Sequence, residues 1–180
     1  MTDIDWANAE SSVGTFYGKY RGTVVNNVDP KQLGRIQVLV PDVSAVLPSS
    51  WALPCVPVAG TQSGTFVLPQ IGAAVWVEFE QGDPDFPIWV GGFWGTSAEV
   101  PSAAKAGLPV SPSIVLQTGA GNSIVISDVP GTGGIAITSR TGAKIVIDDT
   151  GITIDSGRSP KGIQLRGISV GINDPALVVR

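Results

Sequence analysis

Residues 72–95 read Gly-Ala-Ala-Val-Trp-Val-Glu-Phe-Glu-Gln-Gly-Asp-Pro-Asp-Phe-Pro-Ile-Trp-Val-Gly-Gly-Phe-Trp-Gly. Within this stretch Val75, Val77 and Phe79 alternate with Trp and Glu side chains, the period of two that is typical of a strand with one buried face. Residues 81–85 contain a Gly, a Pro and two Asp, so they predict a turn before a second strand. The stretch therefore predicts a β-hairpin, and nothing in it is typical of a catalytic centre.

The composition favours a β protein that associates with other copies. Of the 180 residues 43% are hydrophobic, enough for one domain or two small ones, and 23 Gly with 14 Pro favour short strands and turns. Only 14% are charged, which is low for a monomer and indicates an oligomer. The net charge of −4 argues against a nucleic-acid partner. With no His and the single Cys55, the chain has no internal disulfide, Cys/His zinc site or His-dependent triad.

The first residues, Met1–Thr15, are polar and acidic, and we interpret them as an arm with a short helix over Asp5–Glu10 as a candidate element. They contain no apolar run, so they do not resemble a signal peptide, and no stretch of the chain approaches the roughly 18 apolar residues of a membrane helix. We therefore expect synthesis in the cytoplasm without a signal peptide.

Three segments ahead of the hairpin also have strand character, namely residues 16–25, 33–40 and 51–58. Pro54 and Pro57 predict that the third lies at an edge or is bent, and residues 61–71 are predicted as a loop. Together with the hairpin they give five short strands in about 80 residues, the size of an oligonucleotide/oligosaccharide-binding (OB) barrel. We therefore predict a small Greek-key barrel or sandwich over residues 16–96, for which the five-stranded OB fold is a natural match in size.

Residues 97–112 are rich in Ser, Ala, Pro and Gly and are predicted as a linker to a second domain, residues 113–180. This domain repeats the short pattern Ile-x-Ile or Ile-x-Leu, in which x is any residue, and turn residues separate one pair from the next. The pairs are Ile114/Leu116, Ile124/Ile126, Ile135/Ile137, Ile145/Ile147, Ile152/Ile154 and Ile163/Leu165.

Strands this short cannot close a core in one chain, so stacking must supply it. Each chain could coil into its own β-solenoid, or several chains could wind around a shared apolar axis. A solenoid of so few rungs would leave both ends uncapped, which favours intertwined chains, and three chains are the most economical number. The predicted trimer-core residues are Ile124, Ile126, Ile135, Ile137, Ile145, Ile147, Ile152, Ile154, Ile163 and Leu165.

The first domain resembles a known family. Its matching residues are Tyr20-Arg21-Gly22-Thr23-Val24-Val25, Asp29-Pro30, Leu33-Gly34-Arg35-Ile36-Gln37-Val38 and a run from Pro69 with the form Pro-x-x-Gly-x-x-Val-x-Val-x-Phe-x-x-Gly-Asp-Pro-Asp-x-Pro. The hairpin residues of this motif are Gly72, Gly82, Asp83, Pro84 and Pro87. The chain is similar in these stretches to the central spike proteins of contractile injection systems, such as the phage baseplate assembly protein V and the valine-glycine-repeat spike of type VI secretion.

The resemblance implies an all-β homotrimer, with an OB-fold barrel followed by a triple-stranded intertwined β-helix. It implies a structural spike of a phage tail baseplate or related injection particle, which docks on a separate hub protein and pierces the target envelope when the sheath contracts. The apolar residues Leu177, Val178 and Val179 form a candidate platform for a separate tip protein with proline-alanine-alanine-arginine repeats. The chain contains no stretch like the lysozyme domain of larger relatives, so no enzyme is expected.

Three clusters have a catalytic or binding alternative beside the structural one. Turn and solvation roles account for the hairpin carboxylates Glu78, Glu80, Asp83 and Asp85, for which a glycosidase pair is the alternative. The aromatic residues Trp51, Trp76, Trp89, Phe93 and Trp94 suit core or subunit packing more than nucleic-acid stacking. An axial ion near Asp128, Asp148, Asp149, Asp155 and Asp174 is not predicted, and no cofactor is expected. The alternative functions are a nucleic-acid-binding OB protein and a cell-wall hydrolase component.

Overall fold

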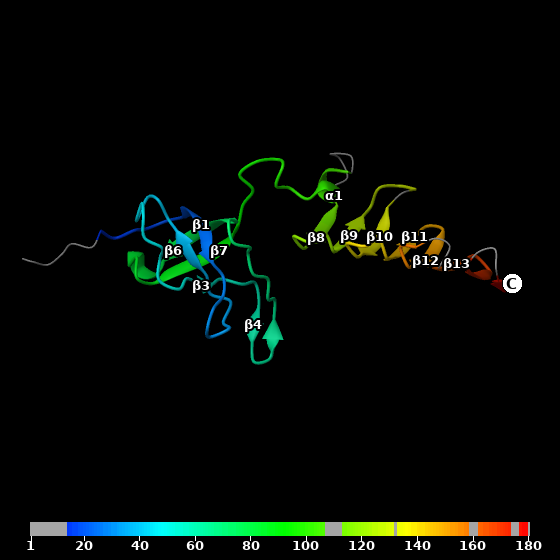
Figure 1. The fold of residues 1–180 in the computed structure, drawn as a ribbon, viewed down its shortest axis with the longest axis horizontal. Helices are drawn as coiled ribbons and strands as arrows, with labels where there is room; N and C mark the ends of the chain where they lie inside the picture. Colours follow the sequence, from blue (N-terminus) through cyan, green and yellow to red (C-terminus); the bar gives the residue numbers. More distant parts are fainter. Residues whose placement is uncertain (1–13, 107–112, 132, 159–161, 174–176, 180) are drawn as a thin grey trace, which may run out of the picture. The chain divides into compact units, whose positions relative to one another are not determined.

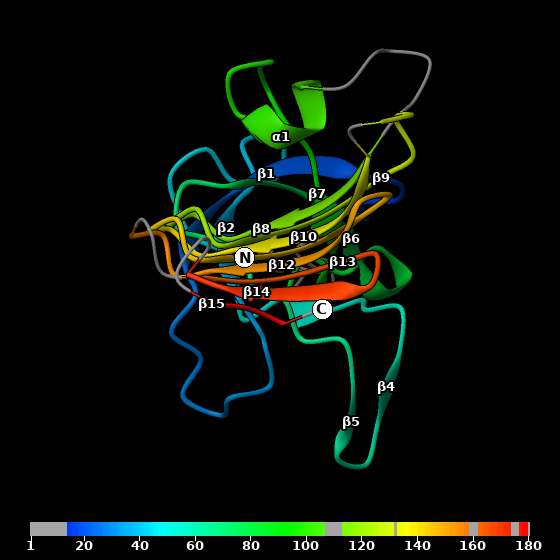
Figure 2. The same cartoon turned by 90° about the vertical axis from the view of Figure 1, so that its right-hand side faces the viewer.

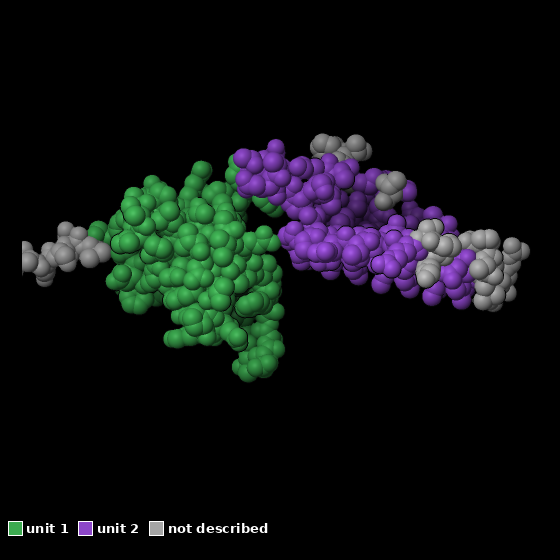
Figure 3. All heavy atoms as spheres, in the orientation of Figure 1, with its two compact units in different colours: residues 1–95 green, residues 96–180 purple. Residues whose placement is uncertain are grey.

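The computed structural model describes residues 14–106, 113–131, 133–158 and 162–173, and the backbone of 177–179. The chain divides into two compact units, residues 1–95 and 96–180, which are described separately below (Figure 3). The predicted arm helix over Asp5–Glu10 lies outside the described residues.

Unit 1 is built on a curled five-stranded sheet (Figure 1). Its strands are β1 (Tyr20–Asn26), β2 (Gln37–Leu39), β3 (Leu53–Pro54), β6 (Ala74–Phe79) and β7 (Pro87–Gly92). They lie in the order β2-β1-β6-β7-β3, and an isolated bridge between Ile36 and Ala52 links the two ends of that order. The predicted five-stranded OB barrel is confirmed, and β3 takes the edge position that its prolines predict.

The hydrophobic core of unit 1 lies inside this curled sheet. Val75, Val77 and Phe79 of β6 are buried, as their alternation predicts. Ile36 and Val38, which alternate with Arg35 and Gln37, are also completely buried. Full burial of one such side chain contributes about 1.5–3 kcal/mol. The other buried apolar side chains of the described residues are Val24, Val40, Ala52 and Trp89.

A nearly buried ion pair shapes the loop between β1 and β2. The Asp29 carboxylate is only 3% exposed and accepts hydrogen bonds from the backbone N–H groups of Lys31 (2.9 Å) and Leu33 (2.8 Å). It also accepts from the guanidinium of Arg35, whose charged end lies 5.4 Å from the ring centre of Trp51. The hydrogen bond from Arg35 is the main reason why the pKa of Asp29 lies well below its usual range.

A second hairpin occupies part of the segment that the sequence predicts as a loop. Strands β4 (Ala59–Gly60) and β5 (Ser63–Gly64) pair antiparallel, and Figure 2 shows them projecting from the sheet. Their Ala, Gly and Ser residues have no alternating pattern, so the sequence gives no strand signal. The predicted strand over 51–58 shrinks to the two residues of β3, because Pro54 and Pro57 have no N–H group to donate.

Unit 2 is a single antiparallel sheet of eight short strands. They are β8 (Ile114–Gln117), β9 (Ser123–Ser127), β10 (Gly134–Thr138), β11 (Lys144–Asp148), β12 (Gly151–Asp155), β13 (Gly162–Arg166), β14 (Ser169–Ile172) and β15 (Leu177–Val179). Each strand pairs with the one before it, so the strands follow one another along the sheet (Figure 1 and Figure 2). A short helix, α1 (Ser102–Lys105), lies in the segment predicted as a linker.

This meander excludes the single-chain solenoid that the repeat left open. The hydrogen-bond ladders join consecutive strands of one chain, and every strand reverses direction. A solenoid would instead bring strands together after a full coil of the chain. Since the backbone of the inner strands is paired within the chain, association between chains is left to side chains.

Two glycines allow strands of the meander to start close to their neighbours. Gly134 and Gly151 open β10 and β12 with φ angles of +132° and +137°. A Cβ atom at these positions would lie 2.2 Å from the carbonyl oxygen of Ile147 and 1.9 Å from that of Leu165. Only glycine fits both the backbone angle and the space, which explains the Gly that precedes the Ile pair in β10 and in β12.

The Asp29 ion pair predicts how unit 1 responds to mutation and pH. Asp29→Asn should lower the urea midpoint of unit 1 at pH 7, because an amide nitrogen then faces the donors of Lys31 and Arg35. The pKa of Asp29 is lowered in the folded state, so its stabilisation is complete above the ordinary carboxyl pKa of about 4 and is lost as pH falls below it.

The gap between the urea midpoints of wild type and Asp29→Asn should therefore be narrower at pH 3 than at pH 7, as tryptophan fluorescence during urea unfolding can show. Asp42→Asn, in an exposed loop, is the control. A gap between wild type and Asp29→Asn that is as wide at pH 3 as at pH 7 would contradict the assigned role.

Candidate trimer interface

The apolar side chains of unit 2 gather on one face of its sheet in two continuous columns. Ile135 lies opposite Ile126 on one side and Ile147 on the other, and the same pairing continues from β8 to β14. The first column contains Leu116, Ile124, Ile137, Ile145, Ile154, Ile163 and Ile172, and the second contains Ile114, Ile126, Ile135, Ile147, Ile152, Leu165 and Val170. All ten predicted trimer-core residues therefore share one face, which we call the isoleucine face.

The isoleucine face is uncovered in the single chain. Ile145 is 40% exposed and Ile154 is 42% exposed, although both lie in the middle of the sheet. Among the described residues of unit 2 none is buried, whereas unit 1 has a complete core. Monomeric proteins rarely expose a continuous apolar patch larger than a few hundred Å², so this face requires a partner surface.

The opposite face changes in character along the sheet. Its central column begins with Val115, Val125, Ala136 and Val146 and continues with Thr153, Gln164 and Gly171. The residues that flank this column are mostly Ser, Thr and Gly or charged. This composition suits contact with water, so the isoleucine face is the one that another chain would cover.

Every charged residue of strands β8 to β14 lies on the opposite face. They are Lys144, Asp148, Asp155 and Arg166. Lys144 stands directly across from Asp155, a favourable pairing of opposite charges. The hydroxyl of Thr150 donates a 2.6 Å hydrogen bond to Asp148 in the turn after β11, and this bond is the main reason why the pKa of Asp148 is lowered. The isoleucine face of these strands therefore carries no charge that would oppose burial.

Comparison with protein families matches both units. Residues 113–178 match the phage baseplate V C-terminal trimerisation domain, and residues 20–94 match the type VI secretion system/phage-baseplate injector OB domain. The chain belongs to the phage baseplate V family. No curated protein matches it in sequence. The trimerisation match supports self-association as a homotrimer, so the isoleucine face is the natural place for contacts between copies of this baseplate V protein.

The family assignment confirms the predicted all-β class, an OB domain followed by a trimerisation domain, and the resemblance to baseplate spike proteins. Intertwining of the three chains stays a prediction, since the ladders of unit 2 join strands of one chain. It makes this protein a structural component of a phage baseplate or of a related injector. The described residues contain no helix long and apolar enough to span a membrane. They also contain no group of three or more His, Cys, Asp or Glu residues placed to hold a metal ion. Asp174, one of the Asp residues considered for an axial ion, lies outside the described residues.

Two glycines of the baseplate V hairpin motif act in backbone contacts. Gly82 has a φ of +81°, and its carbonyl oxygen accepts a 2.8 Å hydrogen bond from the N–H of Phe16. A Cβ atom there would lie 3.1 Å from the ring of Tyr17. Gly72, with a φ of +86°, donates its N–H to the carbonyl oxygen of Val24 at 2.8 Å. Both positions tie the hairpin to neighbouring segments of the barrel.

The remaining motif residues build the turn itself. The Asp83 carboxylate accepts the N–H of Asp85 at 2.9 Å, and Pro87 is buried at the start of β7. Pro84 lines a small pocket, described below. Glu78 forms an ion pair with Lys19 at the surface of β6. Of the four hairpin carboxylates, Asp83 thus serves the turn and Glu78 a surface ion pair.

The aromatic residues separate into core and surface groups. The Nε1–H of Trp89 donates a 3.1 Å hydrogen bond to the carbonyl oxygen of Gly34, and the side chain is only 8% exposed, so it is not available to a neighbouring chain. Trp76 packs against Phe93 with ring centres 4.7 Å apart, and the charged end of Arg21 lies 5.6 Å from Trp76. The sequence missed this contact because Arg21 and Trp76 are adjacent only across the β1–β6 pair.

The candidate tip platform lies at the end of the sheet. The backbone of Leu177, Val178 and Val179 forms β15, which pairs with β14 and extends the meander by one strand. The side chains of these residues are outside the described part of the chain, so a tip contact stays a prediction.

If the isoleucine face is the trimer interface, an Asp substitution should have different effects on the trimer at two neighbouring residues of β12. Ile154→Asp should break the trimer, because a carboxylate buried among apolar side chains without a partner costs several kcal/mol in each of the three chains. Thr153→Asp makes the same substitution on the opposite face and should leave the trimer intact.

Light scattering after size exclusion gives the measurement, with 18.5 kDa expected for the separated chain and about three times that mass for the trimer. If both variants kept the trimer mass, or both lost it, the isoleucine face would not be the interface.

Proposed function

We propose that this protein is the central spike of a contractile phage tail or of a related contractile injection system. The trimer docks on a hub protein at the end of the tube through its OB domain, and unit 2 forms the shaft that pierces the target envelope. The single observation that carries the proposal is the match of both units, in the order OB domain then trimerisation domain, to phage baseplate V models.

The physical properties of unit 2 support a shaft. The backbone ladder runs without interruption from β8 to β15, and two apolar columns follow it from β8 to β14. Three such sheets joined through their isoleucine faces bury all three apolar surfaces together. A chain that separates from the trimer must therefore expose its isoleucine face to water. Resistance to unfolding of this kind suits a part that must remain folded under load.

We further propose that the protein acts without enzymatic activity, cofactor or metal ion, and that its C-terminal end carries a separate tip protein. In the unit 1 hairpin the Asp83 carboxylate holds the turn and Glu78 pairs with Lys19, which supports a structural role for these two acids. In this model, penetration depends on the mechanical work of sheath contraction and on a rigid trimer.

The proposal predicts where the protein is found and what its loss does. Particles purified from a producing strain should contain the protein on the particle axis at the tube end, as averaged electron micrographs with and without the gene can show. The strain without the gene should release no particles that kill target cells, and the wild-type chain should restore killing while Ile154→Asp should not. Full killing by particles that lack the protein would contradict a spike function.

A further inference from the structure

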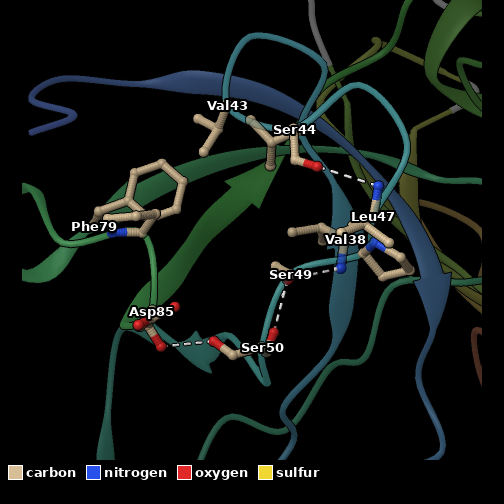
Figure 4. Close-up of a pocket in the computed structure, with 11 residues that line it drawn as sticks. Val38, Val43, Ser44, Leu47, Ser49, Ser50, Phe79 and Asp85 are labelled. Carbon is tan, nitrogen blue, oxygen red and sulfur yellow. Dashed lines mark hydrogen bonds between the residues drawn. The ribbon is translucent and has the colours of Figure 1, made fainter. Parts of the chain in front are cut away.

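Unit 1 contains a small pocket between the loop that follows β2 and the turn that follows β6 (Figure 4). Its walls include Val38, Val43, Leu47 and Phe79, and its rim includes Asp85. The volume is about 200 Å³. Sites for drug-sized molecules and cofactors measure roughly 300–1,000 Å³, whereas a cavity of about 150 Å³ holds one benzene ring. The pocket therefore has the size for a single apolar side chain.

The direction of the strands places this pocket at one end of the barrel. β6 runs from Ala74 to Phe79 into the turn over 80–86, and β7 runs back from that turn to leave unit 1 at Gly95. β2 runs in the same direction as β6, because both are antiparallel to β1. The loop after β2 and the turn after β6 therefore meet at the end of the β6–β7 hairpin that is opposite the exit toward unit 2.

The polar groups inside the pocket already have partners. The hydroxyl of Ser44 accepts the N–H of Leu47 at 3.1 Å, and the hydroxyl of Ser49 accepts the N–H of Val38 at 3.1 Å (Figure 4). These bonds are internal to the loop and hold its shape. The pocket thus offers a preformed apolar surface with few free polar groups, which favours an apolar occupant over a polar ligand.

The two segments that form the rim of the pocket are acidic, and Lys19, which precedes β1 at the same end of the barrel, is paired with Glu78. The loop over 41–50 and the turn over 80–86 contain Asp42, Glu80, Asp83 and Asp85 and no Lys or Arg. The hydroxyl of Ser50 donates to the backbone carbonyl of Asp85 at 2.7 Å, which fixes the turn and leaves the Asp85 carboxylate at the surface. A partner that approaches this end meets a negative field, so complementary charge on that partner is positive.

We propose that this pocket is the docking point of unit 1 on its baseplate partner, and that it receives one aliphatic or aromatic side chain flanked by Lys or Arg of that partner. This inference rests on the proposed function and names the surface and chemistry of its hub contact. A second copy of this chain that met the pocket with its own pocket end would bring the same four carboxylates to the contact, so a two-fold contact of this kind is disfavoured.

Two neighbouring residues provide a matched test. Leu47 lines the pocket and is 70% exposed, while Val46 is 81% exposed and does not line it. Leu47→Lys removes apolar surface from the pocket wall and places a positive charge where the Lys or Arg of the partner is expected to lie. Val46→Lys adds the same charge beside the pocket and leaves the wall unchanged. Purified particles from strains carrying each variant should contain about threefold to tenfold less Leu47→Lys than Val46→Lys protein.

Crosslinking identifies the occupant. A benzophenone-bearing phenylalanine in place of Leu47 is illuminated in assembled particles, and the crosslinked peptide is sequenced by mass spectrometry. A crosslink to another particle protein, at an apolar residue beside Lys or Arg, is the expected result. A crosslink only to another copy of this chain, or to a partner segment without basic residues, would overturn the inference.

The outcomes separate this inference from the function on which it rests. If wild-type protein is present in particles but Leu47→Lys and Val46→Lys are incorporated equally, the pocket is not the docking point and the spike assignment stands. If wild-type protein is absent from purified particles, the spike assignment itself fails. Light scattering of both variants confirms that each is still a trimer, so poor incorporation cannot result from a lost trimer.

Discussion

The structure depends on an apolar surface that one chain cannot bury. Unit 2 presents two columns of Ile, Leu and Val on one face of a thin sheet, and its described residues include no second layer that covers them. Burial of apolar surface is the main driving force of folding, so a sheet of this kind gains its core only when other copies supply it. Folding and association of unit 2 are therefore linked, and its stability depends on the concentration of the chain.

Unit 1, in contrast, buries its hydrophobic core within one chain. Its curled sheet buries Ile36, Val38, Val75 and Val77 completely inside the same chain, and the loop over 29–35 is fixed by an ion pair. One unit can therefore be folded before association, while the other acquires its core through it. A homotrimer links three OB domains, which raises the effective concentration of each of them for a shared partner.

The sequence predicted the elements in which side-chain period and burial agree. Alternation identified β6 and the faces of Ile36 and Val38, and the Ile pairs identified the apolar face of six strands. Prediction failed where pairing depends on distant backbone. The β4–β5 hairpin has no apolar pattern, and Val170 and Ile172 of β14 escaped the repeat because the pair begins with Val. Likewise, the contacts of Arg21 with Trp76 and of Asp29 with Arg35 arise from strand register and loop closure.

The hydrogen-bond ladders within each chain also influence which face and which orientation of the sheet are used in assembly. Because hydrogen bonds within each chain fix the register of all eight strands, the two apolar columns are aligned as soon as the sheet of one chain forms. A slip of one residue in this register would turn the Ile side chains of a strand to the opposite face. The charges of β11 to β13, all on that opposite face, disfavour packing of the sheets in the reverse orientation. The alternation of Ile with Lys, Asp, Thr and Gln in these strands thus specifies both which face is buried and which face must remain in water.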